Sequence, residues 1–180
     1  LTPVAELEPV LLAGSEIARA TLHNADEIAR KDVRVGDRVW LVKAGDVIPA
    51  IESVIKERRD GSEAVFAMPA ACPVCGQPVT RLDGEVAHRC SNPACPAQRV
   101  GRLEHFASRD ALDIRAIGGK VAEALVAQEL VTDPLDLFGL TLERLAEFRI
   151  GDENGGTRKF GKNAQTALQS LESARTLPLD

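Results

Sequence analysis

The stretch CPVCGQPVTRLDGEVAHRCSNPACP, residues 72–96, contains every cysteine of the chain. Cys72 and Cys75 are separated by two residues, Cys90 and Cys95 by four, and 14 residues lie between the two pairs. Each pair can form a knuckle whose thiolates point at one centre, and two knuckles complete a tetrahedron around Zn²⁺. Residues that suit such tight turns lie beside the cysteines: Pro73, Gly76, Pro93 and Pro96. The spacing therefore predicts a zinc site with four cysteine ligands.

Two alternatives exist for this cysteine-rich stretch. Two disulfides would suit a secreted, disulfide-dense scaffold, but the sequence shows no signal-peptide pattern at its start. His88 could replace one cysteine as a ligand, although a place on the surface of the finger loop is the simpler interpretation. Four thiolates leave no coordination position for a catalytic water, so the predicted metal stabilises structure and performs no chemistry.

Residues 1–70 are predicted to form a small closed β-barrel. Strand-like runs rich in Val and Ile follow one another at residues 10–14, 17–22, 37–45 and 46–57. Turns are expected at Gly14, Gly36-Asp37 and Gly45-Asp46. Asn24 is a typical N-cap for one short helix over NADEIARKDV. Several short strands with one helix indicate a barrel of the OB type, and a different small barrel is the alternative.

The pattern turns helical after the cysteines, over residues 98–180. Apolar residues recur near helical spacing in two groups: Leu103, Phe106, Ala107 and Ile114, then Val121, Ala122, Leu125 and Val126. A break at Asp133-Pro134 and a cap at Thr141 precede a further helix. GDENGGTRK, residues 151–159, is expected to be a polar loop, and FGKNAQTALQSLESA a last helix.

A weak internal repeat lies within the helical part. AIGGKVAEAL and KFGKNAQTAL share an apolar residue, glycine, a basic residue and then a helix. A tight glycine turn at a helix N-terminus leaves backbone N–H groups free to bind an anion such as a DNA phosphate, without reading sequence. This predicts phosphate contacts at two turns: Gly118, Gly119 and Lys120 in the first, Gly161 and Lys162 in the second. The alternative is that these glycines only connect helices.

The charge of the chain limits how it can bind nucleic acid. Its formal net charge of −5 argues against a strong, self-sufficient nucleic-acid binder. Residues 88–120 are more basic than the rest of the chain, with three carboxylates, Glu104, Asp110 and Asp113, against six cations: Arg89, Arg99, Arg102, Arg109, Arg115 and Lys120. Either these cations contact DNA phosphates beside the glycine turn at Gly118, or they form a solvated helix face.

Motifs for catalysis are missing from the sequence. GGK lacks the upstream glycine of a P-loop, and Val121 stands where Ser or Thr would hold magnesium. GDENGGTRKFG does not match the dinucleotide-binding glycine pattern. His23 lies at a strand-to-helix transition and is interpreted as a local hydrogen-bonding residue. We therefore predict no catalytic residues in this chain.

Longer stretches of the sequence resemble the bacterial NAD⁺-dependent DNA ligase family. TPVAELEPVLLAGSEIARATLHNADEI, VGDRVWLVKAGDVIP, CPVCG with CSNPACPAQ, and ELVTDPLDLFGLTLERL occur in the order typical of that family. The resemblance covers essentially the whole chain, and RATLHN followed by AGDVIP and the four-cysteine spacing is its most specific part. It implies an α+β multi-domain fold: an OB-fold domain at 1–70, a four-cysteine zinc finger at 71–97 and an all-α helix-hairpin-helix region at 98–180.

The resemblance also implies site residues. Cys72, Cys75, Cys90 and Cys95 correspond to the zinc ligands of the family. Near the DNA minor groove it places Lys43, Val47 and Ile48, with Arg19 as a weaker candidate, and minor-groove binding by a cation beside apolar residues is physically reasonable. The alternative is that Val47 and Ile48 are ordinary strand residues. Ala116 stands where the first hairpin of the family often has glycine.

The activity implied is that of the parent enzyme, which seals single-strand nicks in duplex DNA in replication and repair. Its nucleophile is the lysine of a K-x-D-G motif. KERRDG does not match this motif because its spacing is wrong. RLDG does not match it because Arg81 replaces the lysine and stays protonated. NAD⁺ and Mg²⁺ are expected for the parent but not for this chain. Because the chain starts at Leu1 rather than Met, we expect a piece of a longer protein that is inactive by itself.

Nicked duplex DNA and the adenylation domain of the same parent are the expected partners. We expect a monomer in the bacterial cytoplasm, associated with the nucleoid and with no membrane contact, since no apolar run could span a bilayer. With no Tyr, one Trp and five Phe, the barrel is poorly suited to stacking single-stranded bases. The alternative functions are a stand-alone, non-enzymatic zinc protein that binds nucleic acid or a protein partner, and a zinc ribbon for protein contacts if the cations of residues 88–120 are scattered.

Overall fold

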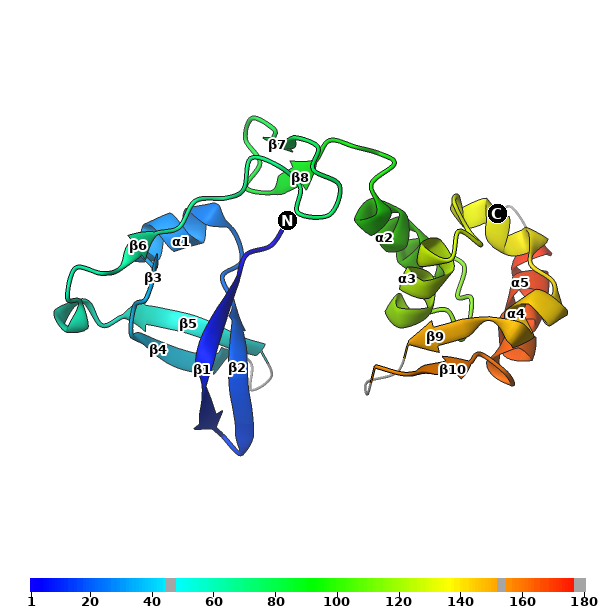
Figure 1. The fold of residues 1–180 in the computed structure, drawn as a ribbon, viewed down its shortest axis with the longest axis horizontal. Helices are drawn as coiled ribbons and strands as arrows, with labels where there is room; N and C mark the ends of the chain where they lie inside the picture. The colour runs from blue at the N-terminus through cyan, green and yellow to red at the C-terminus, as the bar shows by residue number, and fades with distance from the viewer. Residues whose placement is uncertain (45–47, 152–154, 177–180) are drawn as a thin grey trace. The chain divides into compact units, whose positions relative to one another are not determined.

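The computed structural model describes residues 1–44, 48–151 and 155–176. The chain folds into two compact units, Leu1–Ser91 and Asn92–Asp180 (Figure 1). Most strands belong to the first unit and most helices to the second. In the described ranges, no helix has the length and apolar character that crossing a bilayer requires.

A four-stranded sheet dominates the first unit. Its strands stand in the spatial order β1 (Val4–Leu12), β2 (Ser15–Thr21), β5 (Ile48–Val54) and β4 (Val39–Ala44). β1 and β2 are antiparallel, and Ala13 and Gly14 between them have φ of 48° and 75°, as a two-residue hairpin requires. Register shifts within the β1–β2 and β4–β5 ladders add twist and bend to the sheet. The result is a curled half-barrel of OB type (Figure 1).

The sheet is more open than the closed barrel predicted from the sequence. Among the described residues no ladder joins β1 to β4, so the barrel does not close. Closure requires a consistent stagger of the strands around the whole sheet, and β2 meets β5 through only one residue pair, Thr21 with Ala50. The remaining strands of the unit form separate two-stranded ladders: β3 (Arg34–Val35) with β6 (Ala64–Val65), and β7 (Val79–Arg81) with β8 (His88–Cys90).

The predicted helix after β2 is confirmed as α1 (Ala25–Lys31). The Asn24 side chain accepts a hydrogen bond from the Glu27 backbone N–H at 2.9 Å, which is N-cap geometry. The helix ends at Asp32, which has a left-handed φ of 52°. Its one buried residue, Ile28, belongs to the small core of this unit together with residues of the sheet: Ile17, Ala20, Ala50 and Ile51.

An ion cluster around Arg59 stabilises the connections of the first unit. Arg59 follows the short 3-10 helix η1 (Lys56–Arg58). Its Nε donates to Asp37 Oδ1 at 2.7 Å and its Nη1 to Asp32 Oδ2 at 2.8 Å. These hydrogen bonds lower the pKa of Asp37 and of Asp32 below the ordinary range of a carboxyl group. The Asp37 side chain is only 1% exposed, so its charge depends on this partner.

Helices build the second unit and surround one core. They are α2 (Pro96–Ala107), α3 (Gly119–Ala127), η2 (Pro134–Gly139), α4 (Leu142–Glu147) and α5 (Asn163–Arg175). The predicted break and cap are confirmed, since Asp133 caps η2 and the Thr141 side chain accepts from the Arg144 N–H at the start of α4. The largest fully buried side chains of this core are leucines: Leu103, Leu125, Leu137 and Leu145.

The sequence prediction for residues 151–159 is wrong in part. Instead of a continuous polar loop, β9 (Arg149–Gly151) and β10 (Thr157–Lys159) form an antiparallel hairpin. Ile150 is 3% exposed and Phe160, directly after β10, is 4% exposed. The two flanking apolar residues therefore anchor the hairpin to the core, a tertiary effect that the polar composition of the segment conceals.

Candidate metal centre and nucleic-acid interface

The four cysteine side chains come together as the spacing predicts. Their Sγ atoms all lie within 4.8 Å of one another, and Cys75 Sγ lies 3.5 Å from Cys90 Sγ. Tetrahedral Zn²⁺ with Zn–S distances of about 2.3 Å requires sulfurs about 3.8 Å apart. All four thiols are free, so the two-disulfide alternative is not realised. His88 is not part of this ligand group in the described residues.

Local backbone geometry holds the first knuckle. The Gly76 N–H donates to the Cys72 carbonyl at 2.9 Å, and Gly76 has a φ of +70°, which glycine adopts without strain. Backbone N–H groups of Cys75 and Val74 point at the Cys72 sulfur and lower the pKa of its thiol. A thiol that ionises more easily binds metal more readily, because the thiolate is the ligand.

The second pair of cysteines is positioned by a strand and by a helix start. Val79 of β7 pairs with Cys90 of β8, which places the second knuckle beside the first. Cys95 is the residue before α2 and is fully buried, and its N–H donates to the Asn92 carbonyl at 3.1 Å. Four soft thiolates without an open position suit a structural zinc ion.

Arg81 has a structural contact that the sequence does not suggest. Its Nη1 and Nη2 donate to the two carboxylate oxygens of Asp26 on α1, both at 2.7 Å, and its Nε donates to the Glu85 carbonyl. This paired geometry is the most specific contact that arginine makes with a carboxylate. The RLDG sequence therefore ties β7 to α1 within the first unit.

The predicted DNA-contact residues of the first unit fall in two places. Lys43 and Ile48 lie at the same end of the β4–β5 ladder, and Ile48 is 56% exposed. The Lys43 ammonium donates to Ser15 Oγ at 3.1 Å. Val47 lies outside the described residues. Arg19 is on β2 opposite Glu6 and lines a separate, largely apolar hollow of the half-barrel.

The first predicted phosphate turn lies at the start of α3. Gly118 is the N-cap residue and offers no side chain, which leaves the first backbone N–H groups of the helix without a side-chain cap. A Cβ on Gly119 would lie 3.2 Å from Glu104 Oε1, so a larger residue there would require the Glu104 side chain to shift by a few tenths of an ångström. Ala116 has a left-handed φ of +66°, a conformation that glycine would adopt without strain.

The second predicted turn precedes α5. Gly161 has a φ of +56°, and Lys162 is the exposed N-cap residue of the helix. No side-chain hydrogen bond caps this helix start. Both glycine turns therefore lie directly before helices, as the internal repeat predicts.

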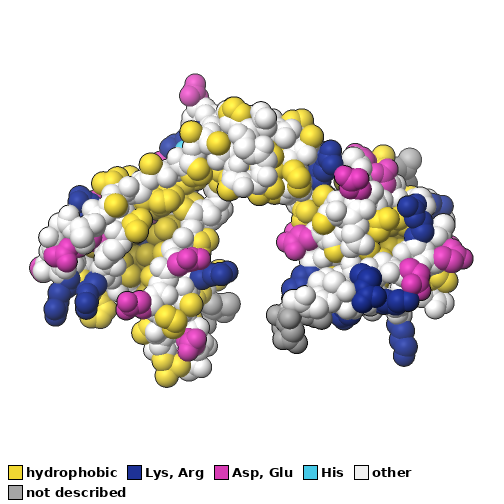
Figure 2. Space-filling model, viewed as in Figure 1, with side chains coloured by type: hydrophobic (Ala, Val, Ile, Leu, Met, Phe, Trp, Pro, Cys, Tyr) yellow, Lys and Arg dark blue, Asp and Glu magenta, His cyan; other side chains and the backbone are white. Residues whose placement is uncertain are grey.

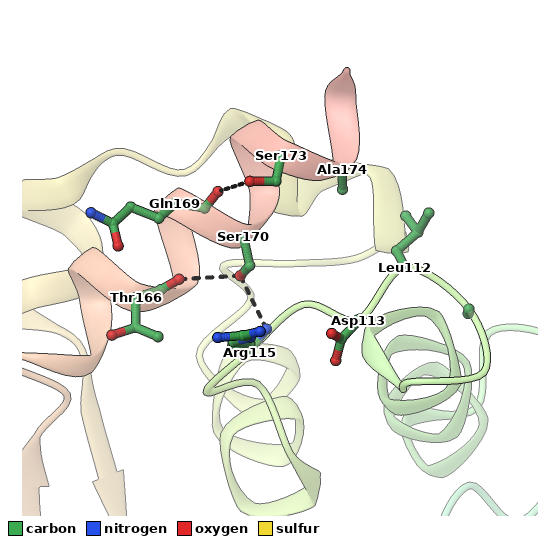
Figure 3. A pocket seen from close by; sticks show the side chains of 9 residues that line it. Leu112, Asp113, Arg115, Thr166, Gln169, Ser170, Ser173 and Ala174 are labelled. Carbon is green, nitrogen blue, oxygen red and sulfur yellow. Dashed lines mark hydrogen bonds between the residues drawn. The ribbon is translucent and has the colours of Figure 1, made fainter. Parts of the chain in front are cut away.

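A shallow hollow separates α5 from the residues that precede the first turn (Figure 3). Its volume is about 540 Å³, and it is lined by Arg115 and, from α5, by Thr166, Gln169, Ser170 and Ser173. Ser170 Oγ accepts from the Arg115 N–H at 3.0 Å and thereby ties the loop to the helix. The lining contains hydroxyls and an amide but no nucleophile paired with a base, so the hollow does not resemble a catalytic site.

The six cations of residues 88–120 do not form one set. Arg89 belongs to the first unit and pairs with Glu85 at 3.2 Å. Arg102 donates to the Pro93 carbonyl at 2.7 Å. Arg109 and Arg115 line a second hollow, of about 750 Å³, that reaches Gly118. Arg109 and Arg115 therefore lie next to the first turn, whereas Arg89 and Arg102 make contacts elsewhere.

Besides the Arg81–Asp26 contact, sequence reasoning missed two further features of the molecule. Arg59 contacts Asp37 and Asp32, which precede it by 22 and 27 positions in the sequence, and no local pattern indicates such contacts. The β9–β10 hairpin escaped notice because its strands have only three residues each, too few for a visible alternation.

The fold and the site together define an OB-type domain with an attached four-cysteine metal module. Two family models match the chain: the OB-fold domain of NAD-dependent DNA ligase over residues 1–63, and the C4 zinc finger domain of NAD-dependent DNA ligase over residues 71–97. The chain belongs to the NAD-dependent DNA ligase family, as the sequence resemblance predicted. Both matches end before the helical region, whose helix-hairpin-helix assignment stays a prediction.

Curated relatives named DNA ligase extend the similarity over the whole chain. The protein of Akkermansia muciniphila is 50% identical over 184 residues, covering 100% of this chain and 23% of that protein. Those of Pelotomaculum thermopropionicum and Alkalilimnicola ehrlichii are 49% and 51% identical, covering 97% and 99% of this chain and 25% and 26% of each protein. The chain thus spans about a quarter of the length of these relatives.

Proposed function

We propose that this chain is the DNA-binding middle segment of an NAD⁺-dependent DNA ligase. The observation that carries the proposal is the ordered match of residues 1–63 and 71–97 to two neighbouring domains of that family. The parent would use NAD⁺ and Mg²⁺ to seal single-strand nicks in duplex DNA during replication and repair. Within these 180 residues no K-x-D-G motif occurs, so the adenylation step belongs to another part of the parent.

In this proposal the zinc ion is structural. Cys72, Cys75, Cys90 and Cys95 hold it as thiolates, and the support is the convergence of their sulfurs. When bound, the ion supplies cross-links between two knuckles and no reactive position. The Arg81–Asp26 contact then holds the β7–β8 strands against α1. The β7–β8 part of the zinc module is therefore attached to α1 within the first unit.

Contact with DNA is assigned to three places. Lys43 and Ile48, with Val47 beside Ile48 in the sequence, would meet the minor groove from the end of the β4–β5 ladder, where Lys43 stands opposite Pro49 and the exposed Ile48 opposite Ala44. Arg19 is the weaker candidate. The two glycine turns of the helical region, which we assign to helix-hairpin-helix motifs, would bind phosphates: Gly118, Gly119 and Lys120, and Gly161 and Lys162.

The family matches support the first two parts of the domain assignment, and the third part rests on the sequence resemblance. We assign residues 1–70 to the OB-fold domain, 71–97 to the zinc finger and 98–180 to the helix-hairpin-helix region. The parent would act as a monomer on nicked duplex DNA, with its adenylation domain as an intramolecular partner, in the bacterial cytoplasm at the nucleoid.

The test compares substrates by fluorescence anisotropy. The zinc-loaded chain is titrated into labelled intact duplex, nicked duplex and single strand of one sequence, at two salt concentrations. We expect weak, salt-sensitive binding to both duplexes, at most a modest preference for the nick, and weaker binding to the single strand, because aromatic stacking residues are scarce. Absence of binding to either duplex at low salt would contradict a DNA-holding role and favour a zinc module for protein contacts.

A further inference from the structure

The sequence from β9 to the second glycine turn, residues 149–162, carries four cations against two carboxylates, Asp152 and Glu153, on a chain whose net charge is −5. Arg149 of β9 stands directly opposite Lys159 of β10, and Arg158 stands opposite Ile150. Lys162 follows three residues after β10. Lys and Arg side chains gather on this part of the second unit (Figure 2). Since the chain as a whole is acidic, this concentration is local and not a consequence of composition.

The hairpin is firmly attached to the core below it. Ile150 is buried, and the Phe160 N–H donates to the Phe148 carbonyl at 2.8 Å. The Gln128 side-chain amide donates to the Arg149 carbonyl at 2.7 Å. These contacts fix the backbone that carries the cations, so the charges are presented on a rigid support.

The cations themselves are weakly engaged. The Lys159 ammonium lies 2.6 Å from Glu147 Oε2, but the two side chains are 52% and 72% exposed, and such surface pairs contribute little to stability. Arg149 donates from Nε to Thr157 Oγ1 at 2.8 Å and pairs with no carboxylate among the described residues. Among the residues that the structure describes, the Arg158 guanidinium has no hydrogen-bond or ion-pair partner.

Placing Arg149 directly opposite Lys159 is unfavourable for the hairpin alone. Like charges at paired positions of an antiparallel ladder repel each other, and a sequence selected only for folding avoids them. The exposed Glu147 carboxylate offsets only part of this repulsion, and a violation of a local rule with so little compensation is typical of a functional surface. An anion lying along this face would remove the repulsion.

We propose that the β9–β10 hairpin is a cationic ribbon that binds the phosphate backbone of double-stranded DNA. Arg149 and Lys159, which stand opposite each other and share one face of the ribbon, make the principal contacts, and the surface continues into the second glycine turn at Gly161. Arginine forks suit phosphate oxygens, and a two-stranded ribbon is narrow enough to follow a groove of the duplex. The inference rests on the proposed function, because it adds a surface to the same duplex-binding chain.

The test measures how the affinity for an intact duplex depends on salt. The zinc-loaded chain is compared with Arg149→Gln, with Lys159→Gln and with the double variant. Arg58→Gln is the matched control, because Arg58 is also exposed and has no ion pair among the described residues but lies on η1 in the first unit. Each phosphate contact contributes about 0.9 to the slope of log K against log salt, or roughly eightfold in affinity near 0.1 M salt.

We expect each hairpin variant to lose about one unit of slope, the double variant about two, and Arg58→Gln much less. Glu147→Gln should bind the duplex more tightly than wild type, because it releases Lys159. Hairpin variants that match Arg58→Gln in affinity and slope would overturn this inference while leaving the proposed function intact. A wild-type chain that binds no duplex would overturn both. The same variants are also titrated with polyglutamate as an acidic protein probe. If they lose binding to polyglutamate but bind the duplex as the wild type does, the inference is overturned in favour of an acidic protein partner.

Discussion

Removal of zinc is predicted to unfold residues 71–97 while the OB-type sheet and the helical core stay folded. In this segment the buried residues are Cys72, 5% exposed, and Cys95, 0% exposed. The larger apolar side chains are open to solvent, with Val74, Leu82 and Val86 at 55%, 60% and 47% exposed. Full burial of one such side chain would contribute about 1.5–3 kcal/mol, and here only part of that is gained.

The metal must therefore supply most of the stability of the module. Structural zinc bound by four thiolates contributes about 10–16 kcal/mol at pH 7 in small zinc modules. β7 and β8 are only three residues long each, so their ladder cannot replace it. By contrast, the sheet and the helical unit have buried residues of their own, such as Ile51 and Leu125. Their folding should survive metal removal.

Amide hydrogen exchange and limited trypsin digestion, both read by mass spectrometry, measure this directly. A chelator should open cleavage after Arg81 and Arg89 and abolish exchange protection in residues 71–97 only. Cys75→Ser should lower zinc binding below one ion per chain. Ser91→Ala is the matched control, because Ser91 lies in the same module and its hydroxyl donates only to the Pro78 carbonyl. Unchanged protection after chelation, or full zinc binding by Cys75→Ser, would refute the reasoning.

Three further predictions concern stability, each measured by urea unfolding with a probe in the unit that carries the change. Arg59→Ala leaves the buried Asp37 carboxylate without its ion partner, at a cost of about 1–3 kcal/mol. Because the folded pKa values of Asp37 and Asp32 are lowered, their contribution is present above about pH 4 and lost as the pH falls below it, and this acid dependence should shrink in Arg59→Ala. Gly161→Ala forces a side chain into a left-handed φ and should cost about 1 kcal/mol, so an unchanged midpoint would contradict that conformation. Asn24→Ala removes the cap of α1 and should cost about 1 kcal/mol, whereas Asn24→Asp should be nearly neutral.

Features encoded within a few residues were predictable from the sequence. The cysteine spacing is a local geometric requirement of a tetrahedral ion, and the sulfurs do converge. Asn24 and Thr141 cap helices because their side chains reach backbone N–H groups only three residues away. The glycine turns before α3 and α5 were visible for the same reason.

Features that depend on distant contacts were not predictable. The openness of the half-barrel depends on how β2 meets β5, a pairing between residues far apart in the sequence. The β9–β10 hairpin is stabilised by the burial of Ile150, which the polar segment GDENGGTRK does not reveal. In the sequence, RLDG differs from the K-x-D-G motif by having Arg81 in place of the lysine. Only the folded chain shows that Arg81 binds Asp26. In each case tertiary packing decides what local propensity leaves open.

Amide chemical-shift mapping of the zinc-loaded chain with an intact duplex tests the DNA-binding role most directly. At 180 residues the chain suits such spectra. We predict salt-sensitive shifts at the β4–β5 end around Lys43 and Ile48, at Gly118–Lys120, and along β10 to Lys162, with the zinc module largely unchanged. Shifts confined to residues 71–97, or no shifts at low salt, would contradict a duplex-binding segment.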